Sequence, residues 1–264
     1  MVQRSYYRTI WISDLHLGTR ACKASSLLDF LRRHIAETLY LVGDIVDGWN
    51  WGPSWHWSPD QQEVVNEVRQ LRRGGANVVF LPGNHDESKV SLVQELFGPI
   101  PTRTSLIHNA ANGLRMLVIH GHQFDGSLNP NRLLPMIGSR AYARGQRIHD
   151  WYNRRAEQAV TDEGRSFSDY LRNNARRAIE FLTDFRDRAV LAAARDHDAD
   201  GVICGHIHRS DHRLIGNVLY VNDGDWVLNR TAVVEERDGT LQVIRWSGAH
   251  ESLAVSETMA QVAS

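Results

Sequence analysis

Five short polar motifs, each placed directly after an apolar run, constrain this chain more than any other feature of its sequence. They are Asp14-Leu15-His16, Gly43-Asp44-Ile45-Val46-Asp47, Gly83-Asn84-His85-Asp86, His120 and Gly205-His206-Ile207-His208. The runs before them (9–13, 39–42, 78–81, 114–119 and 201–204) are nearly all apolar, which is typical of strands buried on both faces. Ligands of layered α/β folds collect in the loops after such strands. The sequence therefore predicts an α/β fold in which five loops converge on one site.

The side chains of these motifs predict a site for two divalent metal ions. The expected ligands are carboxylates, imidazoles and one amide: Asp14, His16, Asp44, Asn84, His120, His206 and His208. Asp14, His16 and His208 would hold one ion, the other three would hold the second, and Asp44 would bridge the two. This mixture of donors suits Mn²⁺, Fe or Zn²⁺ rather than Ca²⁺ alone. Two ions about 3.5–4 Å apart can clamp the attacking and leaving oxygens of a phosphoryl group.

His85 follows a predicted ligand directly, so it would lie over the site without binding metal. That position suits a general acid that protonates the leaving oxygen. Asp86 is placed in the same catalytic group. A carboxylate at a strand end is also an ordinary turn or helix-cap residue. For both Asp47 and Asp86 we therefore expect a role in orienting a neighbouring ligand.

The motif set resembles the calcineurin-like metallophosphoesterase family, because DxH, GDxxD, GNHD, H and GHxH are all present between residues 8 and 246. The DLHLG, GDIVDGW, GNHDE and HGHQFD segments most resemble the bacterial branch that contains UDP-2,3-diacylglucosamine hydrolase. The resemblance implies a sandwich of two mixed β-sheets flanked by helices, with the ligand roles above and His85 as the acid. That branch has Arg at the position of His85, and an acidic residue is commoner at that of His122.

The function that the resemblance implies is hydrolysis of the pyrophosphate bond of a UDP-sugar lipid by a metal-bridging hydroxide, with Mn²⁺ as the favoured ion. The alternative within enzymes is a soluble phosphodiesterase or phosphomonoesterase that acts on a small nucleotide or another phosphate ester. The alternative outside enzymes is a non-catalytic scaffold, against which the complete ligand set argues.

A tryptophan-rich loop follows the second motif. Trp49, Trp51 and Trp55 lie among glycine and proline residues, and Trp is enriched in ligand pockets and at membrane interfaces. We expect these three side chains, together with Asn84 and Arg209, to contact the substrate. The alternative is a small hydrophobic cluster under a long loop.

The chain is expected to form a single domain over residues 1–250 with a helical cap insertion at about 126–195, followed by a tail at 251–264. Residues 130–195 contain 13 Arg against 8 acidic residues, whereas the rest of the chain has 17 basic against 23 acidic residues. Apolar residues spaced by three and four from 171 to 189 predict an amphipathic helix. A basic amphipathic surface can contact an anionic membrane, and an ordinary packed helix pair is the alternative. Interleaved acidic residues argue against nucleic acid as a partner.

The remaining composition indicates a cytoplasmic protein, with contact at the inner face of the cytoplasmic membrane. We find no apolar stretch near 18 residues, no signal-peptide pattern and only two cysteines, Cys22 and Cys204. Nothing in the sequence specifies an oligomeric state.

Four further elements are predicted from apolar spacing. Residues 25–36 and 61–73 have helical patterns, and residues 218–221 and 231–234 have strand patterns. Asp238-Gly239 predicts a hairpin turn. Asn222, Asp223 and Asp225 either support the metal loops or form ordinary turns.

Overall fold

The computed structural model describes residues 4–124, 186–248 and 250–253. The chain divides into two units, residues 1–122 with 191–264 and residues 123–190. Most of the predicted cap at 126–195 and most of the predicted tail lie outside the described residues. The part of the cap that is described, 186–195, is helical, and this helix continues to residue 196. The cap and the domain boundaries therefore stay predictions.

Two β-sheets form the main unit. The first has the strand order β11-β10-β9-β1-β2-β3. Its strands are β1 (Ser5–Ile12), β2 (His34–Val42), β3 (Asn77–Leu81), β9 (Thr231–Glu235), β10 (Leu241–Trp246) and β11 (His250–Leu253). Strands β1, β2 and β3 pair in parallel, and the other neighbours pair antiparallel. This sheet is mixed, as the sequence predicted.

The second sheet is also mixed and has the order β4-β5-β6-β8-β7. Its strands are β4 (Leu106–Asn109), β5 (Arg115–Val118), β6 (Gly201–Cys204), β7 (Asp211–Ile215) and β8 (Val218–Asn222). Strands β5, β6 and β8 are parallel to one another. Parallel strands end at the same edge of a sheet, so the motifs after β5 and β6 are brought together there.

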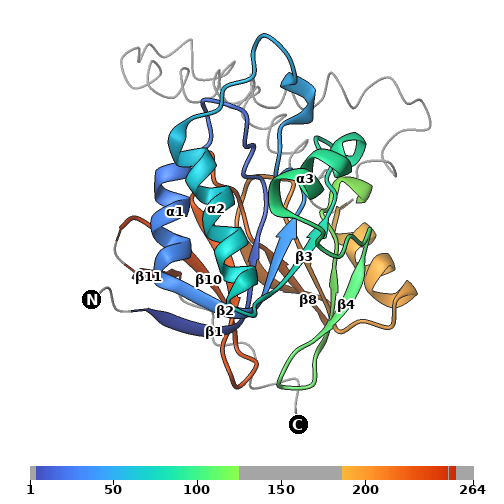
Figure 1. Cartoon of the computed structure of the whole chain (residues 1–264). Helices are drawn as coiled ribbons and strands as arrows, with labels where there is room; N and C mark the ends of the chain where they lie inside the picture. The colour runs from blue at the N-terminus through green and yellow to red at the C-terminus, as the bar shows by residue number, and fades with distance from the viewer. Residues whose placement is uncertain (1–3, 125–185, 249, 254–264) are drawn as a thin grey trace, which may run out of the picture. The chain divides into compact units, whose positions relative to one another are not determined.

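Besides the helical segment 186–196, the described residues form three α-helices, α1 (Ala24–Arg33), α2 (Pro59–Arg73) and α3 (Val90–Phe97), and two short 3₁₀ turns, Gly48–Asn50 and Glu87–Lys89. Figure 1 shows α1 and α2 side by side. Helix α2 begins after Ser58, whose hydroxyl accepts a hydrogen bond from the Gln61 backbone amide. No helix within these residues is long and apolar enough to cross a bilayer.

The predicted helix at 25–36 was wrong at its end, because α1 stops at Arg33 and residues 34–36 already belong to β2. His34 has extended dihedral angles and pairs with Ser5 of β1. Its Nδ1 lies 2.8 Å from the Phe30 carbonyl oxygen. Strand pairing thus overrides a helical apolar pattern at these three positions.

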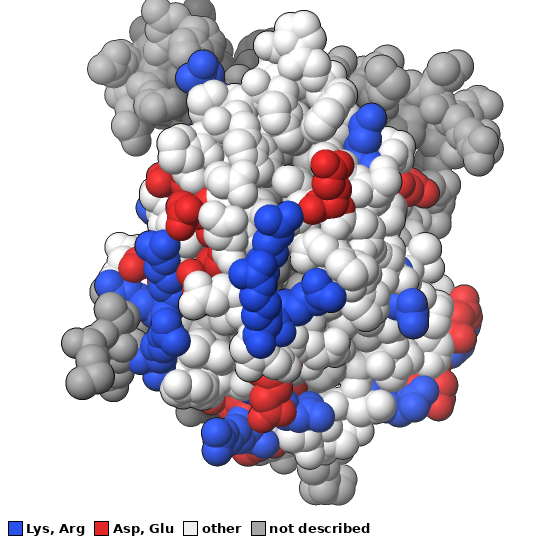
Figure 2. All heavy atoms as spheres, in the orientation of Figure 1, with Lys and Arg blue, Asp and Glu red and all other residues white. Residues whose placement is uncertain are grey.

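Two hydrophobic cores lie on opposite faces of the first sheet. Along β1, Ile10 and Ile12 pack in the core that α1 and α2 share with the sheet, whereas Trp11 packs in the core between the sheets. Burial on both faces explains the nearly continuous apolar runs in the sequence. Figure 2 shows acidic and basic side chains interspersed over the face that carries α1 and α2.

Candidate metal centre

The loops that follow the parallel strands hold several predicted ligands in an unusual backbone conformation. Positive φ angles between 48° and 72° occur at Asp14, His16, Asp44, His206 and His208. Residues with a side chain rarely adopt this region, and such strain collects at functional sites. The strain is consistent with loops shaped to aim side chains.

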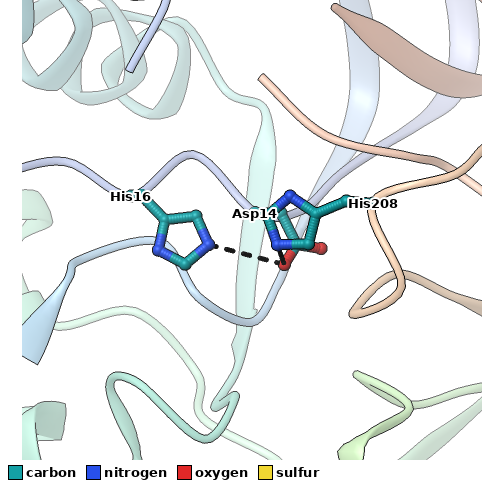
Figure 3. Close-up of side chains that lie close together, drawn as sticks. All are labelled: Asp14, His16 and His208. Carbon is teal, nitrogen blue, oxygen red and sulfur yellow. Dashed lines mark ion pairs between the residues drawn. The ribbon is translucent and has the colours of Figure 1, made fainter. Parts of the chain in front are cut away.

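The first ligand group contains Asp14, His16 and His208, whose ligand atoms all lie within 4.8 Å of one another. His208 Nε2 lies 3.2 Å from Asp14 Oδ1, and His16 Nε2 lies 3.7 Å from the same oxygen. Figure 3 shows the two imidazole rings approaching this carboxylate from two sides. The first and last motifs, almost 200 residues apart in sequence, therefore meet at one point.

The second group contains Asp44, His120 and His206. His120 Nε2 lies 3.5 Å from Asp44 Oδ1, and its Nδ1 lies 2.8 Å from the Val42 carbonyl oxygen. The other carboxylate oxygen of Asp44, Oδ2, lies 3.9 Å from His16 Nε2. Asp44 thus has one oxygen toward each group, which is the arrangement that a bridging ligand requires.

Several buried polar atoms of the predicted ligands have no hydrogen-bond partner among the residues described. They are Asp14 Oδ1, His16 Nε2, Asn84 Oδ1 and His120 Nε2. A buried polar atom without a partner costs free energy, and each of these atoms is a good metal donor. The donor set therefore fits two divalent cations.

Three glycines leave the room that these side chains occupy. A Cβ atom on Gly43 would collide with the His120 ring, and one on Gly83 would collide with Asp44 Oδ1. A Cβ on Gly205 would collide with the Ser13 hydroxyl and approach Asp14 Oδ2 at 2.6 Å. Glycine is needed at these positions because backbone and ligand approach closely.

The carboxylates make the centre strongly attractive to cations. Burial alone lowers the pKa of His120 and of His208. The carboxylate of Asp44 outweighs that effect and raises the pKa of His120 to about 10, and Asp14 raises the pKa of His208 to about 9. Burial likewise opposes ionisation of Asp44, but His120 holds the pKa of that carboxyl below its ordinary value. Metal ions would take the place of these imidazole protons.

His85 lies beside the first group and makes three informative contacts. Its Nδ1 is 3.0 Å from Asp47 Oδ1, and its Nε2 is 3.8 Å from Asp44 Oδ2. The indole of Trp49 stacks on the imidazole with ring centroids 3.6 Å apart. The ring is thereby held on one edge and on one face.

Asp86 is fully buried and holds the backbone of two loops together. Its Oδ1 accepts from the Gly83 amide at 2.7 Å, and its Oδ2 accepts from the amides of Ile45 and Val46 at 2.7 and 3.3 Å. Burial and the neighbouring Asp44 carboxylate raise the pKa of Asp86 to about 7. Its position is that of a residue that orients the second and third motifs.

Known proteins share both the sequence and the fold of this chain. A family model described as calcineurin-like phosphoesterase matches residues 7–210. The chain belongs to this family. It is 28% identical to a UDP-2,3-diacylglucosamine hydrolase of Pseudomonas putida over 246 residues. These aligned residues are 88% of this chain and 93% of that protein. A hydrolase of the same name from Aeromonas salmonicida is 26% identical over 260 residues, covering 92% of this chain and 98% of that protein.

A single mutant of Vps29 from Entamoeba histolytica has the same fold, with a TM-score of 0.50 and 15% identity over 94% of this chain and 97% of that one. The predicted family and the predicted two-sheet architecture are therefore confirmed. This phosphoesterase is a metal-dependent phosphoester hydrolase by family.

The residues predicted to contact the substrate differ in how far their side chains are exposed. Trp49 is 45% exposed beside His85 and Trp51 is 54% exposed, so both can meet a ligand. Trp55 is half-buried against the core and packs against Trp51 and Trp57. Arg209 is exposed directly after His208.

Two supporting residues of this phosphoesterase, Ser13 and Asn229, had no signal in the sequence. Asn229 Nδ2 donates to the carbonyl oxygen of His208 at 2.6 Å and to Asp225 Oδ2 at 2.5 Å. Asp225 Oδ2 itself lies 3.8 Å from His208 Nδ1. A single Ser or Asn in a loop is too common a residue to identify by pattern.

Proposed function

We propose that this phosphoesterase uses two divalent ions to hydrolyse the pyrophosphate bond of a UDP-sugar lipid. The observation that supports it best is that the Asp44 carboxylate lies between two groups of metal donors, 3.5 Å from His120 Nε2 and 3.9 Å from His16 Nε2. The seven predicted ligands would hold the ions, with Mn²⁺ as the favoured metal. When bound, two such ions supply Lewis-acid activation of phosphoryl oxygens and of water.

The chain's own residues position the phosphoryl group and supply a proton. Asp47 accepts from the Nδ1–H of His85, so the other nitrogen, Nε2, is directed toward the centre. A protonated His85 would donate from Nε2 to the departing oxygen, as a general acid does. Asp86 keeps the loops of Asp44 and His85 in register through its three backbone hydrogen bonds.

The substrate class rests on the relatives' names and on the rim of the centre. The curated relatives above are named for UDP-2,3-diacylglucosamine. The described part of the chain has four exposed large hydrophobic side chains, and three of them lie close to ligand loops. Trp49 and Trp51 follow the second motif. The backbone amide of Leu228 donates to Asp225, whose carboxylate lies beside His208. Such side chains suit the apolar portion of a lipid substrate.

The test is hydrolysis of UDP-2,3-diacylglucosamine beside bis-p-nitrophenyl phosphate by Mn²⁺-loaded protein, with identification of the products. We expect fast release of UMP and a lipid phosphate from UDP-2,3-diacylglucosamine. Cleavage of the chromogenic diester alone would keep the two-metal chemistry and reject this lipid. No cleavage of either substrate, with metal bound, would reject the enzymatic proposal. The His85→Ala variant should keep its metal, and its kcat on UDP-2,3-diacylglucosamine should fall about 10²–10⁴-fold.

A further inference from the structure

A single hydroxyl group, that of Ser13, lies between two buried carboxyl groups at the metal edge. Ser13 Oγ is 2.7 Å from Asp14 Oδ2 and 2.5 Å from Asp223 Oδ1. Ser13 is 1% exposed, and both acids are 0% exposed. Ser13 follows β1 in the first sheet and Asp223 follows β8 in the second, so this contact joins the two sheets beside the ligand Asp14.

The number of protons in this contact is limited. A serine hydroxyl has one proton to donate, and an ionised carboxylate can only accept. Two ionised carboxylates at these short distances would leave one oxygen pressed against the Ser13 oxygen with no proton between them. One of the two carboxyl groups must therefore carry a proton and donate it to Ser13 Oγ.

The surroundings identify Asp223 as the protonated group. Asp14 is stabilised as an anion, because its Oδ2 also accepts from the His206 amide at 2.8 Å and its Oδ1 faces His208 Nε2 at 3.2 Å. The other oxygen of Asp223, Oδ2, is buried without a hydrogen-bond partner among the described residues. Burial raises the pKa of Asp223 well above its ordinary value, against the lowering by the Ser13 hydrogen bond. An unpaired oxygen costs less on a neutral acid than on a carboxylate.

We propose that Asp223 is a protonated positioning residue that donates to Ser13 Oγ, which in turn donates to Asp14 Oδ2. With Oδ2 occupied by the Ser13 hydroxyl and the His206 amide, Asp14 Oδ1 is left for the first metal ion. The relay keeps this end of the centre at one negative charge instead of two. Its consequence for metal binding rests on the two-metal site proposed above, and the protonation of Asp223 itself does not.

The direct test is infrared spectroscopy of the metal-free protein at neutral pH. The native protein should show C=O stretches of protonated carboxyl groups, to which Asp86 also contributes because its pKa is about 7, and Asp223→Asn should remove one of these bands. Asp238→Asn is the matched control, because Asp238 is an exposed turn residue that accepts from the Thr240 amide. The proposal would be overturned if the spectrum of Asp223→Asn kept every protonated-carboxyl band of the native spectrum.

Mn²⁺ affinity, measured by titration calorimetry, gives a second readout that needs no substrate. Asn at 223 is neutral and can still donate to Ser13, so Asp223→Asn should bind Mn²⁺ almost as the native protein does. Ser13→Ala and Asp223→Ala break the relay and should bind about 10–100-fold more weakly. Equal losses in Asp223→Asn and Asp223→Ala would contradict the relay. Should Asp223→Ala fail to fold, the comparison of Asp223→Asn with Ser13→Ala still decides.

The relay and the proposed substrate can be tested apart from each other. A protein with the expected infrared band and Mn²⁺ affinities that leaves the UDP-sugar lipid intact would reject the proposed substrate and keep the relay.

Discussion

His85 Nδ1 lies 3.0 Å from Asp47 Oδ1, and this contact decides which nitrogen of His85 faces the metal centre. A carboxylate that accepts from Nδ1–H fixes the orientation of the imidazole ring. Replacing Asp47 should therefore loosen the orientation of His85 and slow proton transfer from its Nε2.

Asp47→Asn should lower kcat less than His85→Ala does, because the imidazole stays but loses its orientation and its anionic partner. The loss should lie below the 10²–10⁴-fold range of general acid catalysis and should be larger for an alkyl phosphate ester than for a p-nitrophenyl ester, which leaves without a proton. Steady-state kinetics on both esters measures it, with Asp60→Asn on helix α2 as a control. Equal losses on both esters would remove His85 from the acid role.

Trp49→Ala and Trp51→Ala should have different effects. Trp49 stacks on His85, so its removal frees the imidazole ring and should lower kcat about 2–10-fold on the UDP-sugar lipid and on the alkyl phosphate ester, whose leaving oxygens need a proton. Trp51 packs on Trp55 instead, so its loss should affect only the lipid. If Trp49→Ala and Trp51→Ala changed the kinetic constants equally on each of the two substrates, this division of roles would be contradicted.

Metal removal should abolish turnover and lower the melting temperature without unfolding the protein, because the two cores contain no metal ligand. A ligand at 100 times its Kd stabilises by about 2.7 kcal/mol, which corresponds to roughly 5–10 °C in a chain of this size. Differential scanning calorimetry with and without chelator measures the shift. Asp44→Asn should show little shift, and a full native shift in that variant would argue against a bridging Asp44.

Mn²⁺ affinity should weaken as the pH falls. The pKa values of about 10 for His120 and about 9 for His208 mean that both imidazoles hold protons in the metal-free protein at neutral pH. Metal binding must release these protons, and each unit of lower pH opposes that release. Calorimetry in buffers of different ionisation enthalpy should detect the released protons, and binding without proton release would refute the expectation.

Glu235 is a buried acid outside the predicted ligand set, and it joins the two sheets. Its carboxylate in β9 accepts from Thr9 Oγ1 at 2.7 Å and from the Ala111 amide at 2.8 Å, and lies 2.9 Å from His108 Nε2 of β4. Burial opposes its ionisation, yet the hydrogen bond with His108 and the others lower its pKa to about 2.

Because this pKa lies below the ordinary value of 4.5, the stabilisation by Glu235 is fully present above pH 4.5 and is lost as the pH falls toward 2. Glu235→Ala should cost about 3–5 kcal/mol at neutral pH, since it leaves buried partners unpaired. Urea unfolding at pH 7 and pH 3 measures both effects, with the exposed Glu37→Gln as control. A Glu235→Ala protein as stable as the native one at pH 7 would show that Glu235 does not hold the sheets together.

The sequence by itself determined the buried strands that precede the five motifs, and it predicted the ligands that follow them. Apolar runs buried on both faces are distinctive, and chance rarely places a polar motif at the end of every such run. The strands predicted near residues 78–81 and 201–204 match β3 and β6 within one residue. The end of α1 was wrong because the pairing of His34 with Ser5 involves another strand, which local apolar spacing does not report.

Only the tertiary structure decided how the supporting residues meet. Ser13 and Asp223 are 210 residues apart, and Trp49 and His85 are joined by packing alone. These contacts depend on the order of strands in each sheet and on the distance between the sheets. Hydrophobic periodicity specifies which face of a strand is buried, but it does not specify which side chain from another loop is packed against it.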